Sequence, residues 1–141
     1  MTRAIPGIPI EQQSARWLYI ATLWGEARGE PTRGKLAVGW VIRNRSRRRN
    51  QAIQEVCLAP KQFSCWNPDD PNRSKMLAAY DTDPGTWGMC EAVVDLIDSG
   101  DTMDPTTGAD HYFAHQSIAE PSWAARMKVT AEIGRHRFLI G

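Results

Sequence analysis

The chain has 141 residues, which suits one domain with a single hydrophobic core. Hydrophobic residues make up 42% of it, and no stretch approaches the roughly 18 apolar residues that a membrane-spanning helix needs, which argues against stable membrane insertion. The net charge of +1 divides into +7 over residues 1–50, −9 over residues 51–120 and +3 over residues 121–141. This separation predicts complementary surfaces within the molecule, or a basic face on a neutral body.

Neither the N-terminal segment nor the cysteines indicate a secreted protein. Residues 1–10 are expected to be an arm outside the main domain, residues 11–141, and prolines interrupt the apolar part that a signal peptide would need. Cys57, Cys65 and Cys90 are an odd number, so they cannot all pair within the chain. We expect three reduced, mostly buried thiols, with a Cys57–Cys65 disulfide as the alternative.

Helices are expected in the first two thirds of the chain. Apolar residues at helical spacing predict a first helix over residues 11–27 that stops near Gly29. Pro31 suits the first turn of a second helix, which ends in arginines at the negative end of its dipole. Further helices are expected around residues 52–58, 73–81 and 84–99, with a loop at residues 61–72.

Short β-prone segments follow the helices, at residues 111–114, 128–133 and 136–140. Asp83 suits the cap of the helix at residues 84–99, Pro84 its first position and Gly100 its end. The order of the expected elements, helices followed by short strands, predicts a single α+β domain that is mostly helical.

The segment GEARGEP, residues 25–31, contains two glutamates four positions apart. Glu26 ends an apolar helix two residues after Trp24, and burial against apolar rings raises a carboxyl pKa, as an acid that donates a proton at neutral pH requires. Glu30 lies beyond the helix end, where capping the next helix is a sufficient role. The alternative is that both glutamates are solvated and cap a helix or pair with Arg28 or Arg33, and spacing alone favours this alternative over catalysis.

Five arginines lie within RNRSRRRN, residues 43–50. Arginine runs bind phosphate backbones, but here no aromatic residue interleaves the run and it falls at an expected helix end. A solvated basic helix end is therefore favoured over a nucleic-acid site, although the run can still steer an anionic polymer.

The histidines raise the possibility of a metal site. His111 and His115 lie four apart, with Asp110 adjacent and His136 downstream, and zinc hydrolases use such residues; Glu26 would then be the base. On a strand, however, residues four apart are roughly 13 Å apart, too far for one metal. We therefore expect no metal.

Aromatic residues gather near the expected loops: Phe63, Trp66, Tyr112, Phe113 and Trp123. Rings near turns are typical of a carbohydrate groove, and core filling is equally favoured. Trp66 and Tyr112 are the two expected to be most exposed to a ligand.

Four blocks of the sequence resemble the cell-wall hydrolase family that includes the spore-cortex-lytic enzymes of Gram-positive bacteria. They are WGEARGEPTRGKLAVGWVIRNR, CLAPKQFSCWN, DPTTGADHYF and TAEIGRHRF, with Trp123 between the last two. In the family order they cover nearly the whole chain. The resemblance implies a lysozyme-like fold, no cofactor, and Glu26 as the catalytic acid and base that cleaves peptidoglycan between N-acetylmuramic acid and N-acetylglucosamine.

The resemblance also implies roles for other residues. Gln62, Phe63, Ser64 and Trp66 would line one side of a substrate groove, and His111, Tyr112 and Phe113 the other, with Trp123 also binding substrate. Glu30, Thr130 and His136 would support Glu26 or orient the sugar.

The reaction implied is a lytic transglycosylation that leaves 1,6-anhydromuramic ends, and an internal nucleophile removes the need for a second carboxylate. A muramidase would need Glu30 or another acid, such as Asp110, as partner. The sequence also leaves open a zinc amidase, or a non-catalytic basic module that binds wall polymer or nucleic acid.

A compact chain without a signal peptide or wall-binding domain suggests a bacteriophage endolysin for a Gram-negative host, with a cytosolic or prophage-encoded bacterial protein as the alternative. It would be a monomer that accumulates in the host cytoplasm and reaches the wall after membrane permeabilisation, binding glycan strands and no nucleic acid.

Overall fold

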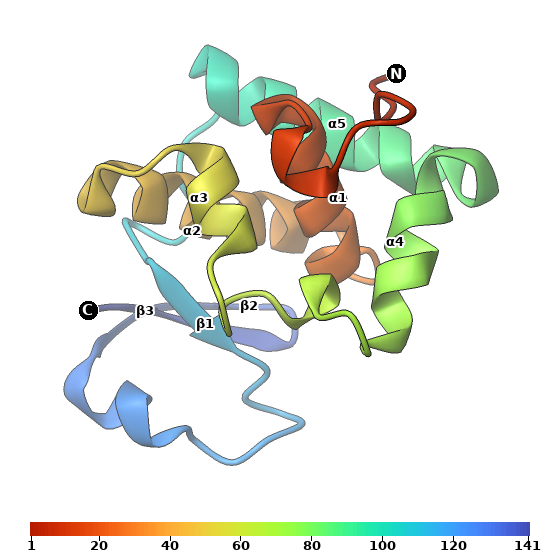
Figure 1. The fold of residues 1–141 in the computed structure, drawn as a ribbon. Helices are drawn as coiled ribbons and strands as arrows, with labels where there is room; N and C mark the ends of the chain where they lie inside the picture. Colours follow the sequence, from red (N-terminus) through yellow and green to blue (C-terminus); the bar gives the residue numbers. More distant parts are fainter.

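The computed structural model describes residues 1–141, in which five α-helices precede a three-stranded sheet (Figure 1). The helices are α1 (Ala15–Ala27), α2 (Thr32–Arg49), α3 (Ile53–Leu58), α4 (Pro71–Thr82) and α5 (Pro84–Ser99). The strands are β1 (His111–Phe113), β2 (Lys128–Ile133) and β3 (His136–Ile140), and three 3-10 helices are η1 (Ile10–Gln12), η2 (Ser64–Trp66) and η3 (Ser122–Arg126). The expected mostly helical α+β class is confirmed.

Local capping explains where the helices begin and end. Ser14 accepts a hydrogen bond from the backbone N–H of Trp17, so α1 starts at Ala15 and the expected start at residue 11 was wrong. Asp70 caps α4, which begins inside the expected loop. Helix α5 ends, as expected, at Gly100, whose φ of +78° is unfavourable for other residues.

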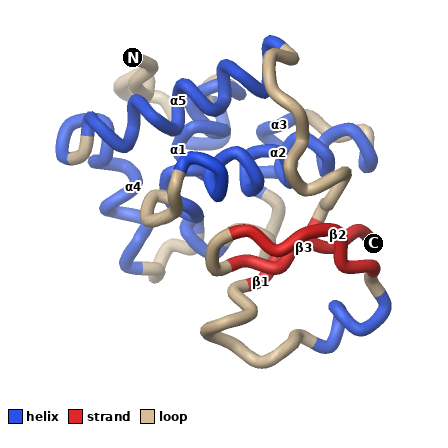
Figure 2. Tube along the Cα trace, turned by 180° about the vertical axis from the view of Figure 1, so that it is seen from behind, coloured by secondary structure: helices blue, strands red, loops and turns tan.

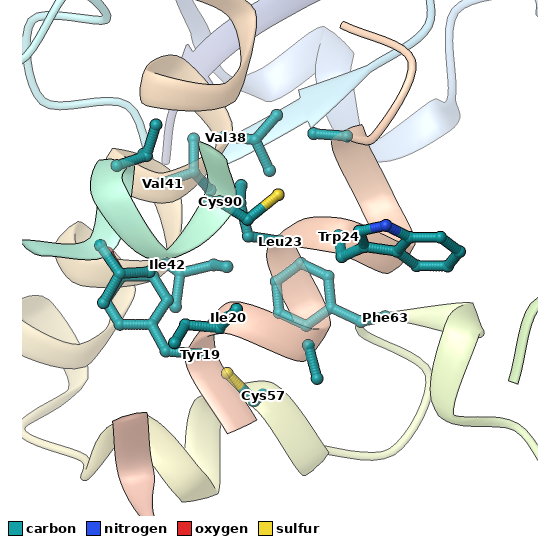
Figure 3. Packing of buried hydrophobic residues seen from close by; sticks show 14 of the residues in the cluster. Tyr19, Ile20, Leu23, Trp24, Val38, Val41, Ile42, Cys57, Phe63 and Cys90 are labelled. Atoms are coloured by element: carbon teal, nitrogen blue, oxygen red, sulfur yellow. The ribbon is translucent and has the colours of Figure 1, made fainter. Parts of the chain in front are cut away.

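Helix α1 runs through the centre of the core, where its Tyr19, Ile20 and Leu23 pack among side chains of the other helices (Figure 3). Residues 17–24 of α1 are all buried. The other four helices pack around it, so that 28 buried residues form one hydrophobic cluster that also includes Phe138 of the sheet. All three cysteines are free and buried, as expected from the sequence. No helix has both the length and the apolar character needed to cross a membrane.

The antiparallel sheet has the order β1-β3-β2 and lies at one end of the helical body (Figure 2). Alternation along β3 places Phe138 in the main core and Leu139 in a second cluster with Phe113 and Ala124. The turn between β2 and β3 contains Gly134, with φ +58°. The sheet thereby brings His136, at the start of β3, to the end of α1.

The N-terminal arm is fixed against the helices at the far end from the sheet (Figure 1). The backbone of Thr2 donates to Glu91 of α5 over 2.7 Å and accepts from the indole N–H of Trp87 over 3.0 Å. Gln13 holds the arm further along by hydrogen bonds to the backbone of Ile5. These contacts anchor the arm to α5 and to the segment just before α1, away from the sheet.

Candidate active site

A cleft of about 330 Å³ lies where the end of α1 meets the β2–β3 turn and the segment after β1. It is lined by Gly25, Glu26, Ala27, Arg28, Gly29, Glu30, Ala114, Ser117, Arg135 and His136. Both glutamates of the GEARGE motif therefore reach one cleft, but their surroundings differ.

Glu26 is a half-buried acid in the last turn of α1. Its Oε1 accepts a hydrogen bond of 2.9 Å from the hydroxyl of Tyr112 in β1. Burial raises the pKa of Glu26, and this outweighs the lowering by Tyr112, the Cys65 thiol and the positive charge of Arg45. The cleft thus holds a carboxyl group that binds a proton more readily than an exposed glutamate does.

Gly25 lets Cys65 of η2 come close to the backbone beside Glu26. A Cβ atom at position 25 would lie 2.9 Å from both Cβ and Sγ of Cys65 and 3.1 Å from Sδ of Met76. Only glycine leaves this space, so η2 and α4 close one side of the pocket around the carboxyl group.

Glu30 is buried, with a side chain only 6% exposed, and is held by the β2–β3 turn. Its Oε2 lies 3.3 Å from Nε of Arg135, and its Oε1 lies 3.0 Å from Nδ1 of His136. The expectation that Glu30 caps the second helix was wrong, because Pro31 is the N-cap of α2 and no side chain caps it. The carboxylate instead ties α1 and α2 to the turn.

His136 connects the surroundings of the two glutamates. Its ring lies edge-to-face against Tyr112, with centroids 4.9 Å apart, while its Nδ1 faces Glu30. Burial lowers the pKa of His136, and the charge of Glu30 only partly offsets this, so the imidazole favours its neutral form. Glu30, His136, Tyr112 and Glu26 form a contiguous row.

Several residues expected in a substrate groove pack inside the protein. Phe63 is 3% exposed and lies under the guanidinium of Arg45, and Phe113 is 5% exposed in the second cluster. The half-buried Trp66 donates its indole N–H to Thr22 over 2.9 Å. These three rings hold the loops in place beside the site and do not line the 330 Å³ cleft.

The remaining expected binding residues lie in different places. Gln62 and Ser64 are exposed, and Oε1 of Gln62 accepts a 3.2 Å hydrogen bond from Arg45. His111 contacts Asp110 and lies 5.3 Å, ring to ring, from Trp123, which is 40% exposed. Trp123 lines a separate groove of about 570 Å³ with Ser122, Arg126, Met127 and Gly141.

Thr130 lies away from Glu26, at an irregularity in the pairing of β2 with β3. Its hydroxyl donates a 3.4 Å hydrogen bond to the carbonyl of Phe138. Of the three expected supporting residues, Glu30 and His136 line the cleft and Thr130 does not.

Most arginines of the run at residues 43–50 make contacts within the protein. Arg43 pairs with Asp98, Arg48 lies 3.3 Å from Asp110, and Arg45 is buried with its Nε donating to the carbonyl of Asp110. Arg49 is exposed at the end of α2. The complementary charges predicted from the sequence are therefore present between α2 and the acidic middle of the chain.

No group of three or more histidine, cysteine or acidic side chains is arranged to hold a metal ion. His115 lies 3.7 Å from Glu132, His111 contacts Asp110, and His136 faces Glu30. The three histidines thus have separate partners, and a zinc amidase would have no ligand set.

Two cleft residues, Arg28 and Arg135, were not predicted as functional from the sequence. Arg28 lies within the GEARGE motif, where it had been considered only as an ion-pair partner. Arg135 follows Gly134 in the turn, and this turn in the closing block was the signal that could have identified it.

Residues 29–139 match the family described as Cell Wall Hydrolase, a span that begins just after Glu26. The fold is similar to that of the catalytic domain of the germination-specific lytic transglycosylase SleB from Bacillus anthracis, with 23% identity and a TM-score of 0.67 over 96% of this chain and 98% of that one. It is also similar to the catalytic domain of the Bacillus cereus SleB protein, with 26% identity and a TM-score of 0.66 over 99% and 97% of the two chains. No curated protein sequence matches the chain significantly.

Proposed function

The chain belongs to the cell wall hydrolase family and degrades peptidoglycan, and we propose that it cuts the glycan strand between N-acetylmuramic acid and N-acetylglucosamine with Glu26 as acid and base. The observation that carries the proposal is the environment of the Glu26 carboxyl group. Its carboxyl group lies in an open cleft, burial raises its pKa, and Tyr112 fixes one of its oxygens. A group that must first give a proton and then take one back needs these properties.

The proposed reaction is a lytic transglycosylation. The protonated Glu26 donates its proton to the bridging oxygen, and the bond from that oxygen to C1 of the muramic acid breaks. The C6 hydroxyl of the same sugar attacks C1 and gives its proton to the Glu26 carboxylate, which restores the acid. The products are a 1,6-anhydromuramic end and a free 4-hydroxyl on N-acetylglucosamine, without water being consumed.

The surroundings of Glu30 and Asp110 favour this reaction over that of a muramidase. A two-carboxylate glycosidase needs a second acid free to act as base or nucleophile. Glu30 is buried against Arg135 and His136, and Asp110 accepts from the backbone of Gly141 while contacting His111 and Arg48. Both carboxylates serve the fold, so an internal nucleophile is the better explanation.

The test is cleavage of purified wall sacculi, followed by loss of turbidity and by mass spectrometry of the soluble fragments. Glu26→Gln should lose at least about a hundredfold in rate, because no proton donor remains. Glu30→Gln should lose much less activity per folded molecule, and Glu11→Gln, which makes the same charge change on the exposed surface, should lose none.

Anhydromuropeptides would support transglycosylation, whereas reducing muramic ends would support the muramidase. Undiminished cleavage by Glu26→Gln would overturn the assignment of the acid. The zinc amidase predicts loss of activity with excess chelator, and the binding module predicts salt-sensitive binding without turnover.

We further propose that the protein is a monomeric phage endolysin that acts on the host wall after the membrane is permeabilised. The exposed basic end of α2 supports this role, since membrane and wall are anionic. Expression in a Gram-negative host should cause lysis only when chloroform is added. Lysis without permeabilisation would contradict it.

A further inference from the structure

We propose that Arg28 and Arg135 form a subsite for a carboxylate carried by the muramic acid residue whose bond is cut, an inference that rests on the proposed function. The two arginines lie in the same cleft as Glu26, one at the end of α1 and the other in the β2–β3 turn. They would make the enzyme selective for a charged, muramic-acid-containing strand.

The balance of charge in the cleft is the first reason. The proposed reaction starts with Glu26 protonated and therefore uncharged, and burial raises the pKa of Glu26 and lowers the pKa of His136. One negative charge, on Glu30, therefore faces the positive charges of Arg28 and Arg135. The buried ammonium of Lys35, which donates to the backbone carbonyl of Glu30, adds a further positive charge beneath the cleft. The site is electropositive when the acid is ready to act.

The placement of Arg28 is the second reason. Its guanidinium donates to the carbonyl of Gly25 and to Oδ1 of Asn72, over 3.2 and 2.7 Å, and neither acceptor is charged. The group also lies over the ring of Trp24, with Cζ 4.4 Å from the centroid. These contacts fix its orientation without neutralising it, so it needs little reordering to receive an anion.

Arg135 is the more accessible of the two arginines. Its side chain is 63% exposed, with Nε 3.3 Å from Glu30 and Nη2 donating to the carbonyl of Gly29 over 3.4 Å. Its Nη1 has no partner in the protein and is available to a ligand. A planar guanidinium held along one edge can still donate from another edge to a carboxylate.

The chemistry of the glycan identifies the anion. N-acetylglucosamine carries no carboxylate, whereas every muramic acid carries a lactyl group on O3. In N-acetylmuramic acid that lactyl group either ends in a free carboxylate or is joined by an amide to a stem peptide that has carboxylates of its own. The substituent lies on the same sugar ring as the C1 that reacts, so it must lie near Glu26 in any productive complex. The lactyl group and the stem peptide both present a carboxylate, and substrates that carry only one of the two can distinguish them.

The test compares three soluble glycan strands as substrates of the wild-type protein. The first substrate is the intact strand, which carries the carboxylates of its stem peptides. The second is a strand from which an amidase has removed the stem peptides, so that only lactyl carboxylates remain. The third is a strand whose amines are first acetylated and whose carboxylates are then converted to neutral amides with a carbodiimide and ethanolamine. We expect kcat/KM on the neutral strands to be about tenfold below that on at least one charged strand, mostly through KM, as expected for the loss of one charge-assisted hydrogen bond. The charged strand that keeps full activity identifies the source of the anion.

Arg135→Gln should lower the ratio of charged-strand to neutral-strand activity towards one, whereas Arg3→Gln, an equal charge change on the exposed N-terminal arm at the far end from the sheet, should keep the wild-type ratio. Equal cleavage of all three strands by the wild type, or an unchanged ratio in a folded Arg135→Gln, would overturn the subsite alone. The wild-type comparison stands even if Arg135→Gln does not fold. A wild type inactive on all three strands would overturn the proposed function as well.

Discussion

The hydroxyl of Tyr112 donates a 2.9 Å hydrogen bond to Oε1 of Glu26, and the two residues are 86 positions apart in the chain. One lies in the last turn of α1 and the other in β1, so this bond joins the helical body to the sheet at the point of proposed chemistry. Tyr112 is held in turn by His136 and by Phe138, whose ring centroids lie 4.9 and 5.8 Å away. Tyr112 is therefore a positioning residue whose ring cannot shift without moving the sheet.

Tyr112→Phe should move the pH dependence of the reaction. The Tyr112 hydrogen bond lowers the pKa of Glu26 against the larger effect of burial, so its removal should raise that pKa further. Because the proposed reaction starts from protonated Glu26, the basic limb of the kcat/KM profile should shift to higher pH. The maximal rate should fall by about tenfold, since the acid loses its fixed orientation.

Tyr80→Phe is the matched control, because Tyr80 is half-buried between Arg3 and Trp87, far from the cleft. Its profile should overlay that of the wild type. A basic limb that stays in place in Tyr112→Phe would show that Glu26 does not control it.

Gly25→Ala should destabilise the protein and reduce cleavage together. The new Cβ would lie 2.9 Å from Cβ and Sγ of Cys65, which are packed and cannot move freely. We expect a loss of about 1–3 kcal/mol in the free energy of unfolding, measured with urea, as for overpacking in other cores. Gly85→Ala meets no atom within 4 Å in the first turn of α5, so it should cost nothing. Equal stabilities for the two variants would contradict the close packing of η2 on α1.

Most helix boundaries could be predicted because they depend on neighbouring residues. Pro84 and Gly100 mark the two ends of α5, and the arginines at the end of α2 lie where the helix dipole favours them. The start of α1 was missed since Ser14, inside the expected helix, acts as its cap. Asp83 was correctly placed before α5, but its carboxylate accepts from Trp24 and makes no capping hydrogen bond.

The site could be predicted only in part, since its details depend on contacts distant in sequence. The position of Glu26 at the end of an apolar helix was readable from local pattern. The burial of Glu30 was not, because its partners Arg135 and His136 lie more than a hundred residues along the chain. Nor could the pattern show that Trp66, in a loop of polar residues, turns inward to Thr22.

His136 should make the protein less stable as the pH falls. Burial lowers the pKa of His136 below the 6.5 of the unfolded chain, so near and below that pH the unfolded state binds more protons than the folded state. The neutral histidine thus makes its full contribution to the free energy of unfolding above pH 6.5, and this contribution decreases as the pH drops through and below that value. His136→Gln should be less stable at pH 7.5, since the contact with Glu30 is lost, but its stability should fall less between pH 7.5 and about 5.5. Urea unfolding at both pH values measures the free energy of unfolding of each protein. An equal change between the two pH values in wild type and His136→Gln would rule out His136 as a source of the pH dependence of stability.

Asp83→Ala should weaken the junction between α1 and the start of α5. Oδ2 of Asp83 accepts the indole N–H of Trp24 over 3.0 Å, and Trp24 is only 4% exposed. Alanine leaves that buried donor without a partner, so we expect a loss of about 1–3 kcal/mol in the free energy of unfolding. Asp83→Asn keeps an acceptor oxygen and should recover most of it, apart from the small effect of charge at a helix N-terminus. Urea unfolding followed by tryptophan fluorescence measures the stability of both variants. If Asp83→Asn were as unstable as Asp83→Ala, the stabilisation by Asp83 would come from its charge and not from the hydrogen bond to the indole.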